Sequence, residues 1–200
     1  MPRPRLTVAP AGSRLALPPA ADGGWVHLVE AGLVRPVAIT ADGREFGLGL
    51  LGPGEAFLQD ERDAAPGIGL YVDAVDDARC LTFPRTELSA VAAEDPETAA
   101  RLLHALCGRA ADLAELAVSL TLESPPDRLA RLIGHLARRH GVAEAGAVRV
   151  RVRQQDLAAM VGLCRETVNA ALGRLAAEGR LRIGRQTIWI PAAGDAPDAG

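Results

Sequence analysis

Lysine is missing from this 200-residue sequence, in which all 22 basic side chains are arginine. Aromatic residues are few, and the three cysteines, Cys80, Cys107 and Cys164, are far apart. Such cysteine usage argues against a disulfide scaffold or a zinc cluster and suits a reducing cytoplasm, where we expect the protein to reside. No apolar run is long enough to cross a membrane, and the opening MPRPRLTVAPAGSRLALPP lacks a signal peptide's apolar segment. We therefore expect no membrane partner.

Charge divides the chain into an acidic and a basic part. Residues 1–122 carry 10 Arg against 17 Asp and Glu, a net charge of −7, whereas residues 123–200 carry 12 Arg against 8 acids, a net charge of +4. Between Asp127 and Pro191 the balance reaches +7. A basic half in a near-neutral protein is typical of nucleic-acid binding, although an Arg-rich surface that serves only solubility has the same composition.

Short strands separated by turns are the pattern of residues 6 to about 93. WVHLVEAGLVRPVAIT is rich in β-forming residues, the ADG after it is a hairpin signal, and REFGLGLL resumes the strand pattern. GPGEAF is a further tight turn, and YVDAV and ARCLTFP add two strands. This pattern predicts a small antiparallel barrel or sandwich in residues 1–94.

A helical period follows in residues 95–122. Asp95 can cap a helix whose first turn begins with Pro96. Apolar residues then recur at alternating spacings of four and three, which is a heptad seam that needs a partner. A second copy of the helix would give a two-fold homodimer, although the stripe can instead pack on its own β-domain. The predicted dimer interface comprises Ala99, Leu103, Leu106, Ala110, Leu113, Ala117 and Leu120.

Residues 123–191 predict a third domain. SPPDRLARLIGHLARRHG begins with a Ser-x-x-Asp capping pattern and stops at Gly141, and its Ser-Pro-Pro break is the best candidate for a hinge. A Gly/Ala-rich loop and the strand VRVRV precede two short helices joined through Gly162, and RLRIGRQTIWIP predicts two strands joined by a Gly-containing turn. This is the arrangement of a winged helix-turn-helix, and we expect the tail, residues 192–200, to be disordered.

Polar side chains open the second of these helices. Leu157, Val161, Leu163, Val168, Leu172 and Leu175 can form the core of the motif. Arg165, Glu166, Thr167 and Asn169 are then left near the helix end that enters the major groove. Arginine can donate two hydrogen bonds to guanine, and glutamate can accept one from N4 of cytosine. Glu166 can also simply stabilise the helix dipole, which needs no DNA.

The segment LAAMVGLCRETVNAAL resembles the recognition segment of the CRP/FNR family, whose members typically show a run close to VGxSRETVSR. QQDLA, LAAEGRLRI and PDRLARLIGHLARRHG extend the resemblance outward. VHLVEAGLVRPVAITADGREFGLGLLGPGEAF resembles that family's β-roll, and TFPRTELSAVAAEDPETAARLL resembles the roll's exit and the dimer helix. The resemblance covers nearly the whole chain. It implies an α+β fold, with an N-terminal antiparallel β-roll like a cyclic-nucleotide-binding domain, a long dimerisation helix and a C-terminal winged helix-turn-helix.

Carried over residue by residue, the resemblance makes Arg165 and Glu166 the base readers. It also places Thr167 and Gln155 on the phosphate backbone and Arg185 in the wing turn, and the predicted DNA-binding set further includes Cys164, Asn169 and Arg174. Two departures matter, both in the recognition segment. Cys164 replaces the family's usual Ser and is a poorer cap, and Ala170 replaces a basic residue, which should relax readout at one base pair.

Members of the family often bind a cyclic nucleotide through a Gly-Glu pair and an Arg-Ser pair. Here these pairs align with Leu58-Gln59 and Ile68-Gly69, and Arg62 is out of register, so we expect no cyclic-nucleotide binding of the usual kind. No cysteine precedes Cys80, which excludes the iron–sulfur cluster of oxygen-sensing members. Alternatives that stay open are a haem sensor, redox sensing by Cys107 or Cys164, an unrecognised small molecule and no effector at all. The residues that could serve a haem are Pro2, His27, His104 and Cys107.

These observations predict a homodimeric transcription regulator that acts on a near-palindromic site in double-stranded DNA. The resemblance to the family further implies an activator that contacts RNA polymerase. An alternative is a sensing module whose C-terminal domain binds a protein. An enzyme is not expected, because the roll has only His27 for a cupin-like metal site and no Ser-His-Asp order or phosphate loop stands out. We expect no cofactor and no metal.

Overall fold

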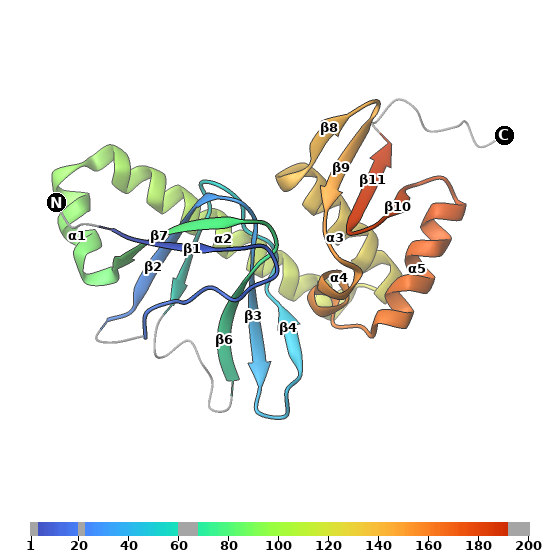
Figure 1. The fold of residues 1–200 in the computed structure, drawn as a ribbon, viewed down its shortest axis with the longest axis horizontal. Helices are drawn as coiled ribbons and strands as arrows, with labels where there is room; N and C mark the ends of the chain where they lie inside the picture. The colour runs from blue at the N-terminus through green and yellow to red at the C-terminus, as the bar shows by residue number, and fades with distance from the viewer. Residues whose placement is uncertain (1–3, 20–22, 60–67, 192–200) are drawn as a thin grey trace. The chain divides into compact units, whose positions relative to one another are not determined.

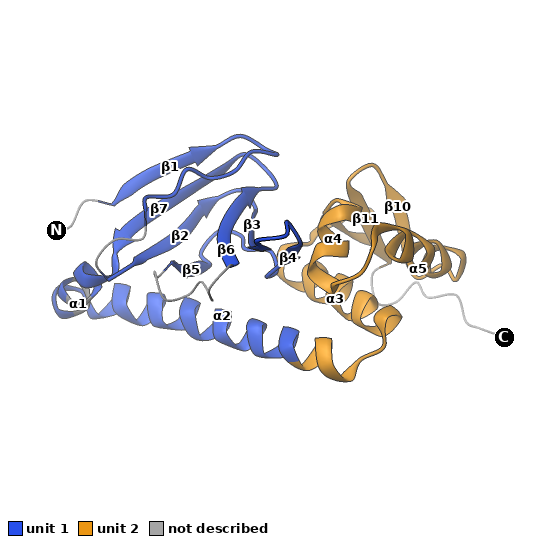
Figure 2. Ribbon diagram, turned by 90° about the horizontal axis from the view of Figure 1, so that it is seen from below, with its two compact units in different colours: residues 1–117 blue, residues 118–200 orange. Residues whose placement is uncertain are grey.

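The computed structural model describes residues 4–19, 23–59 and 68–191. Two compact units divide the chain, residues 1–117 and residues 118–200 (Figure 2). The boundary falls inside one continuous helix, so the last turn of that helix packs within the second unit. The domain limits expected from the sequence, residues 1–94, 95–122 and 123–191, stay a prediction. None of the helices in the described parts combines the length and apolarity that a membrane span requires.

Two antiparallel sheets form the β-roll of the first unit (Figure 1). One sheet has the strand order β1–β7–β2–β5, and the other has the order β4–β3–β6. The predicted ADG hairpin is confirmed between β3 and β4, where Gly43 has a positive φ. The strands are β1 (Arg5–Ala9), β2 (Trp25–Ala31), β3 (Val34–Thr40), β4 (Glu45–Gly47), β5 (Ala56–Gln59), β6 (Ile68–Ala74) and β7 (Ala78–Pro84).

Inward-facing apolar side chains from both sheets meet in one buried cluster. Val29 and Cys80 come from the first sheet, and Val34 and Val72 come from the second. Alternate residues of a strand point to opposite faces, so β6 contributes Val72 and Ala74, and β7 contributes Ala78 and Cys80. The cluster comprises Ala9, Leu15, Val29, Val34, Leu51, Phe57, Val72, Ala74, Ala78 and Cys80.

Two helices follow the roll, α1 (Arg85–Glu94) and α2 (Pro96–Leu122). The strand pattern expected up to about residue 93 is wrong for residues 85–94. The chain leaves β7 after Pro84, and Glu87 in the first turn favours a helix N-terminus. Asp95 caps α2 as predicted, because its Oδ1 accepts from the N–H groups of Glu97 (3.1 Å) and Thr98 (3.2 Å). Within the first unit, α2 runs along the roll (Figure 2).

The second unit contains a helix-turn-helix and a four-stranded sheet of order β10–β11–β9–β8. The Gly/Ala-rich segment that precedes VRVRV was predicted as a loop, but it contains the strand β8. Ala145 and Gly146 both have positive φ, the geometry of a tight two-residue hairpin turn. The elements are α3 (Pro125–His140), β8 (Val142–Glu144), β9 (Ala147–Arg151), α4 (Gln154–Val161), α5 (Arg165–Ala177), β10 (Arg182–Gly184) and β11 (Thr187–Pro191). The tail expected to be disordered, residues 192–200, lies outside the described residues.

Both ends of α3 agree with the sequence. Ser124 is the N-cap, and its Oγ accepts from the N–H of Asp127 (3.5 Å). At the other end Gly141 has an extended backbone, so positive φ is not the reason for a glycine there. A Cβ at this position would lie 2.2 Å from the carbonyl oxygen of Ala137 and 2.3 Å from Val148. The close approach of β9 to the end of α3 therefore requires a glycine.

Candidate functional site

The turn between α4 and α5 determines where α5 begins. Gly162 follows α4 in the left-handed conformation (φ 68°, ψ 35°), and its N–H donates to the carbonyl of Ala158. The N–H of Leu163 donates to the same carbonyl at 3.1 Å. Cys164, in extended conformation, then precedes α5. Because a side chain is strained at positive φ, glycine at position 162 lets the two helices follow each other within three residues.

Burial differs between the two sides of α5. Val168 and Leu172 are fully buried, as are Leu157 and Val161 of α4, which confirms most of the predicted core. Leu163 and Leu175, the other predicted core residues, are only half-buried. On the exposed side, Glu166, Ala170, Gly173 and Ala177 are aligned at about 100° per residue. Apart from Glu166 this face carries small side chains, so a ligand can approach the helix backbone closely.

The predicted reading residues at the start of α5 are all exposed: Cys164, Arg165, Glu166, Thr167 and Asn169. Arg174 is also exposed, but nine helical residues after Arg165 it lies about 180° around the helix axis, on the other flank. Gln155 is exposed in the first turn of α4, and Arg185 is exposed in the turn between β10 and β11. The structure therefore gathers five of the eight predicted residues at one helix end.

Hydrogen bonds order the first turn of α5. The Sγ of Cys164 lies 3.0 Å from Oγ1 of Thr167, and Cys164 makes no capping bond to a backbone N–H. The pKa of Glu166 lies below its usual value, because its carboxylate accepts from its own N–H and from the Cys164 side chain, with Arg165 nearby. Glu166 is thus held ionised, as an acceptor. A carboxylate at a helix N-terminus is also favoured by the helix dipole.

Arg128 of α3 was missed by the sequence analysis. One of its terminal nitrogens donates to the carbonyl of Val161 at 2.8 Å. The other donates to the carbonyls of Leu120 and Glu123, both at 3.2 Å. One side chain therefore joins the end of α2 to the end of α4, just before the turn at Gly162. Nothing in a single sequence distinguishes this arginine from those exposed on α3.

Arg153 and Asp156 hold the start of α4. The Nε of Arg153 donates to Oδ2 of Asp156 at 2.8 Å, and its Nη2 donates to Oδ1 at 3.2 Å. Asp156 is completely buried, so this two-bond pairing offsets the cost of burying a carboxylate. Gln155, which lies between them in the sequence, is exposed.

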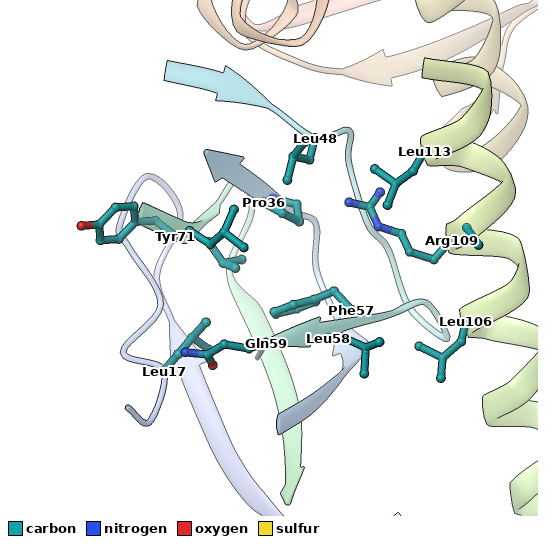
Figure 3. Close-up of a pocket in the computed structure, with 13 residues that line it drawn as sticks. Leu17, Pro36, Leu48, Phe57, Leu58, Gln59, Tyr71, Leu106, Arg109 and Leu113 are labelled. Carbon is teal, nitrogen blue, oxygen red and sulfur yellow. The ribbon is translucent and has the colours of Figure 1, made fainter. Parts of the chain in front are cut away.

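A cavity of about 330 Å³ lies in the first unit between the roll and α2 (Figure 3). Leu58 and Gln59, where the family's Gly-Glu pair was expected to align, line it, so this position is inside the cavity. Its walls are otherwise largely apolar, with Arg109 the charged exception. The lining residues are Leu17, Pro36, Leu48, Phe57, Leu58, Gln59, Leu70, Tyr71, Val72, Leu106, Arg109, Ala110 and Leu113.

The cavity changes how the apolar stripe of α2 is interpreted. Leu106, Ala110 and Leu113, assigned to a dimer seam, line the cavity against their own roll. Leu103 and Ala117 of the predicted seam do not line the cavity and are exposed, Leu103 to 63%. Arg109 was missed, although its helical spacing from Leu106 and Leu113 places it on the same face.

Buried polar groups support one wall of this cavity. The Nδ1 of His27 lies 2.9 Å from Oγ1 of Thr82, and its Nε2 lies 2.9 Å from Oε1 of Gln59. The Nε2 of Gln59 in turn donates to the carbonyl of Pro18 at 3.2 Å. Burial lowers the pKa of His27 to about 4, so the ring is neutral and donates its Nε2 proton to Gln59. The Gln59 amide is therefore held in place.

The residues considered for haem or redox sensing differ in accessibility. Both ring nitrogens of His27 have partners inside the roll, whereas His104 and Cys107 are exposed on α2. Burial raises the pKa of the Cys80 thiol to about 11, which makes it unreactive, while Cys107 and Cys164 are exposed. Pro2 and Arg62 lie outside the described residues. Within the described ranges, no three His, Cys, Asp or Glu side chains gather closely enough to hold a metal ion.

Comparison with known proteins agrees with this geometry. The Crp-like helix-turn-helix domain matches residues 127–193. A relative from Mycobacterium tuberculosis, named a CRP-like cAMP-activated global transcriptional regulator, is 30% identical over 171 residues, covering 84% of this chain and 76% of the relative. The cyclic AMP receptor protein of Thermus thermophilus is 33% identical over 173 residues, with the same coverage. A solved transcriptional regulator of the CRP/FNR family from Thermus thermophilus has a TM-score of 0.71 at 27% identity, covering 94% of each chain.

Proposed function

Because this chain belongs to the CRP/FNR family of transcription regulators, we propose that it acts as a homodimer that activates transcription at a near-palindromic DNA site. We further propose that it does so without control by a cyclic nucleotide, and that as an activator it contacts RNA polymerase. The observation that carries the proposal is the exposed pair Arg165 and Glu166 in the first turn of α5.

The residue roles follow from exposure and chemistry. Arg165 donates to guanine, and Glu166, held ionised, accepts from cytosine N4. Thr167 and Gln155 contact phosphates, as does Arg185 from the wing. Arg174, on the other flank of α5, suits a phosphate better than a base edge, and Cys164 and Asn169 border the bases read by the first turn. The small residues along the exposed face of α5 favour a close approach to the groove.

Dimerisation is supported by the apolar side chains that one chain leaves exposed on α2. Leu103 and Ala117 are exposed and do not line the cavity, whereas Leu106, Ala110 and Leu113 line it. Burial of the exposed part of Leu103 alone would contribute about 1–2 kcal/mol per protomer. In a two-fold dimer the two copies of α5 would lie about 34 Å apart, one turn of DNA.

The absence of cyclic-nucleotide control rests on the chemistry of the cavity. Holding a ribose and a cyclic phosphate requires a carboxylate acceptor and a cation on the roll. Leu58 and Gln59 offer neither, and the amide of Gln59 is already bound to His27 and Pro18. We therefore do not transfer cyclic AMP binding to this chain from the relatives that are named for it.

Selection of sites from a random pool of double-stranded DNA, using the full chain purified without additives, tests the proposal. We expect a two-fold motif at micromolar or lower protein concentration, with affinity that falls steeply with salt. Arg165→Ala should lose preference at one base pair per half-site, whereas Arg101→Ala, on the exposed surface of α2, should select the same motif. Recovery of no motif, or of a motif that needs added cyclic AMP, would contradict the proposal.

A further inference from the structure

The sheet β10–β11–β9–β8 of the second unit (Figure 1) buries the apolar side chains of one of its faces. Val150 of β9 and Ile188 of β11 are paired on that face and are almost completely buried. Because alternate residues of a strand point to opposite faces, their neighbours in the strands point the other way. This outer sheet face carries Val142, Glu144, Arg149, Arg151, Arg182, Gly184, Thr187 and Trp189.

Cross-strand pairing places three side chains of the outer sheet face in one row. Arg182 of β10 pairs with Trp189 of β11, and Trp189 pairs with Arg149 of β9. The Cζ atom of Arg182 lies over the indole ring of Trp189, 5.5 Å from its centroid. A guanidinium that stacks on an aromatic ring still presents N–H donors along its edge. The row therefore holds one cation on each side of an indole.

Trp189 is fixed on the sheet from two sides. Its ring lies against Gly184, where a Cβ would be 2.5 Å from Cζ3 of the indole, so a side chain at this position would displace the ring. Its Nε1 donates to Oε2 of Glu144 at 3.3 Å, and Nε of Arg149 lies 2.9 Å from the same oxygen. The indole is thus a rigid support for the stacked guanidinium of Arg182.

Positive charge dominates the outer sheet face. Arg149, Arg151 and Arg182 lie on it, and Arg185 is exposed in the turn that joins β10 and β11. Glu144 is the one carboxylate among the strand residues of this face and offsets one of the four charges. Along β9 and across the strands, the arginine Cα atoms are spaced by about 7–10 Å. An array of this extent suits a partner with repeated negative charges better than a single small anion.

We propose that the outer sheet face binds the phosphate backbone of the duplex DNA that flanks the operator, through Arg149 and Arg182. This inference rests on the proposed function, which brings duplex DNA to Arg185 at the end of the same sheet. Arg182 covers one face of the Trp189 indole, so the row suits phosphates better than the stacked bases of a single strand. Phosphates carry no sequence information, so the contact raises affinity and leaves the selected motif unchanged.

Two duplexes that carry the same selected motif test this contact, with binding followed by fluorescence anisotropy. The shorter duplex, of about 20 base pairs, spans two half-sites one helical turn apart, and the longer one, of about 40 base pairs, adds a flank on each side. Two added phosphate contacts per protomer should make binding to the longer duplex about tenfold tighter at moderate salt, and its dependence on salt steeper. The gain should be equal for two unrelated flanking sequences.

Three variants identify the residues responsible. The double variant Arg149→Gln/Arg182→Gln should lose most of the gain and bind the shorter duplex as the wild type does. Arg138→Gln/Arg139→Gln removes the same charge from the exposed end of α3 and should keep the gain. Glu144→Gln should bind the longer duplex more tightly than the wild type, an increase that misfolding cannot produce. Far-UV circular dichroism and thermal unfolding establish that each variant is folded.

Two results would overturn the inference: the wild type binds both duplexes equally, or the gain persists in folded Arg149→Gln/Arg182→Gln. A gain confined to one of the two flanking sequences would overturn it as well, because phosphates alone do not distinguish sequences. A chain that selects a motif and binds both duplexes equally contradicts only the flanking contact. A chain that selects no motif contradicts the proposed function, and the flanking contact with it.

Discussion

The thiol of Cys164 lies 3.0 Å from the hydroxyl of Thr167, three residues into α5, where an N-cap oxygen would normally accept the backbone N–H of Thr167. Its extended backbone (φ −72°, ψ 155°) already suits a capping residue. The recognition helix thus begins with N-cap geometry but without a capping bond. Residue 164 is therefore a position where exchanging one atom, sulfur for oxygen, should change the stability of the helix.

Replacing Cys164 by Ser should stabilise the second unit by about 0.5–1 kcal/mol, because a hydroxyl caps a helix better than a thiol. The midpoint of thermal unfolding should rise by a few degrees. Cys107→Ser, an exposed position on α2, is the matched control and should leave the midpoint unchanged. A lower midpoint for Cys164→Ser would show that the thiol contact with Thr167 is worth more than a cap.

Ala170→Arg should add a base contact. Ala170 lies on the exposed face of α5, one turn after Glu166, so a guanidinium there can reach the groove. The expected gain in discrimination is about 1–3 kcal/mol at one base pair per half-site, measured by competition between sites that differ there. Ala177→Arg adds the same charge two turns further on and should raise affinity for all sequences alike. If Ala170→Arg also raised affinity for all sequences alike, with no gain in discrimination, position 170 would contact only phosphate.

Removing the Arg128 side chain should destabilise the second unit. Arg128→Met loses three hydrogen bonds to backbone carbonyls and leaves those oxygens without their donor, at a cost of about 2–4 kcal/mol in the free energy of unfolding. Urea unfolding measures the loss. Arg138→Met, exposed near the end of α3, should change the free energy by less than about 0.5 kcal/mol. Similar values for the two variants would remove the role assigned to Arg128.

Stability should fall as the pH decreases from about 6.5 to 4. His27 has a pKa of about 4 in the folded chain against an ordinary value of 6.5. In this window the unfolded chain binds more protons than the folded chain, so protonation favours unfolding, by up to about 3 kcal/mol at the acid end. Urea unfolding followed by Trp25 fluorescence, in a Trp189→Phe background, reports on the first unit.

His27→Gln should flatten this pH dependence between pH 4.5 and 6.5, and His104→Gln, on the exposed side of α2, should retain it. The carboxylates with lowered pKa, including Glu166 and Asp95, release their protons at lower pH and contribute little to the same window. An unchanged slope in a folded His27→Gln chain would show that other groups titrate there.

Local patterns determined much of the fold. The cap at Asp95, the cap at Ser124 and the helix junction at Gly162 were all visible in the sequence, because each depends on residues within one turn of the chain. The same holds for the exposed start of α5, since helical periodicity alone separates Val168 and Leu172 from Arg165 and Glu166. The helix α1 and the strand β8 were missed, because neither has an apolar period of its own.

The features that only the tertiary structure decided are contacts between residues that are distant in sequence. Arg128 acquires its role by reaching carbonyls at positions 120, 123 and 161, and Arg109 becomes the charged group of a cavity because strands of the roll lie opposite α2. An apolar stripe such as Leu103 to Leu113 indicates that the helix packs against another apolar surface. It does not indicate which surface, since the roll and a second chain offer the same apolar chemistry. The sequence by itself determined the helices, their caps and the polar group that opens α5. Packing between distant segments decided which arginines are buried and which atoms they contact, because burial and the arrangement of partner atoms are properties of the folded chain.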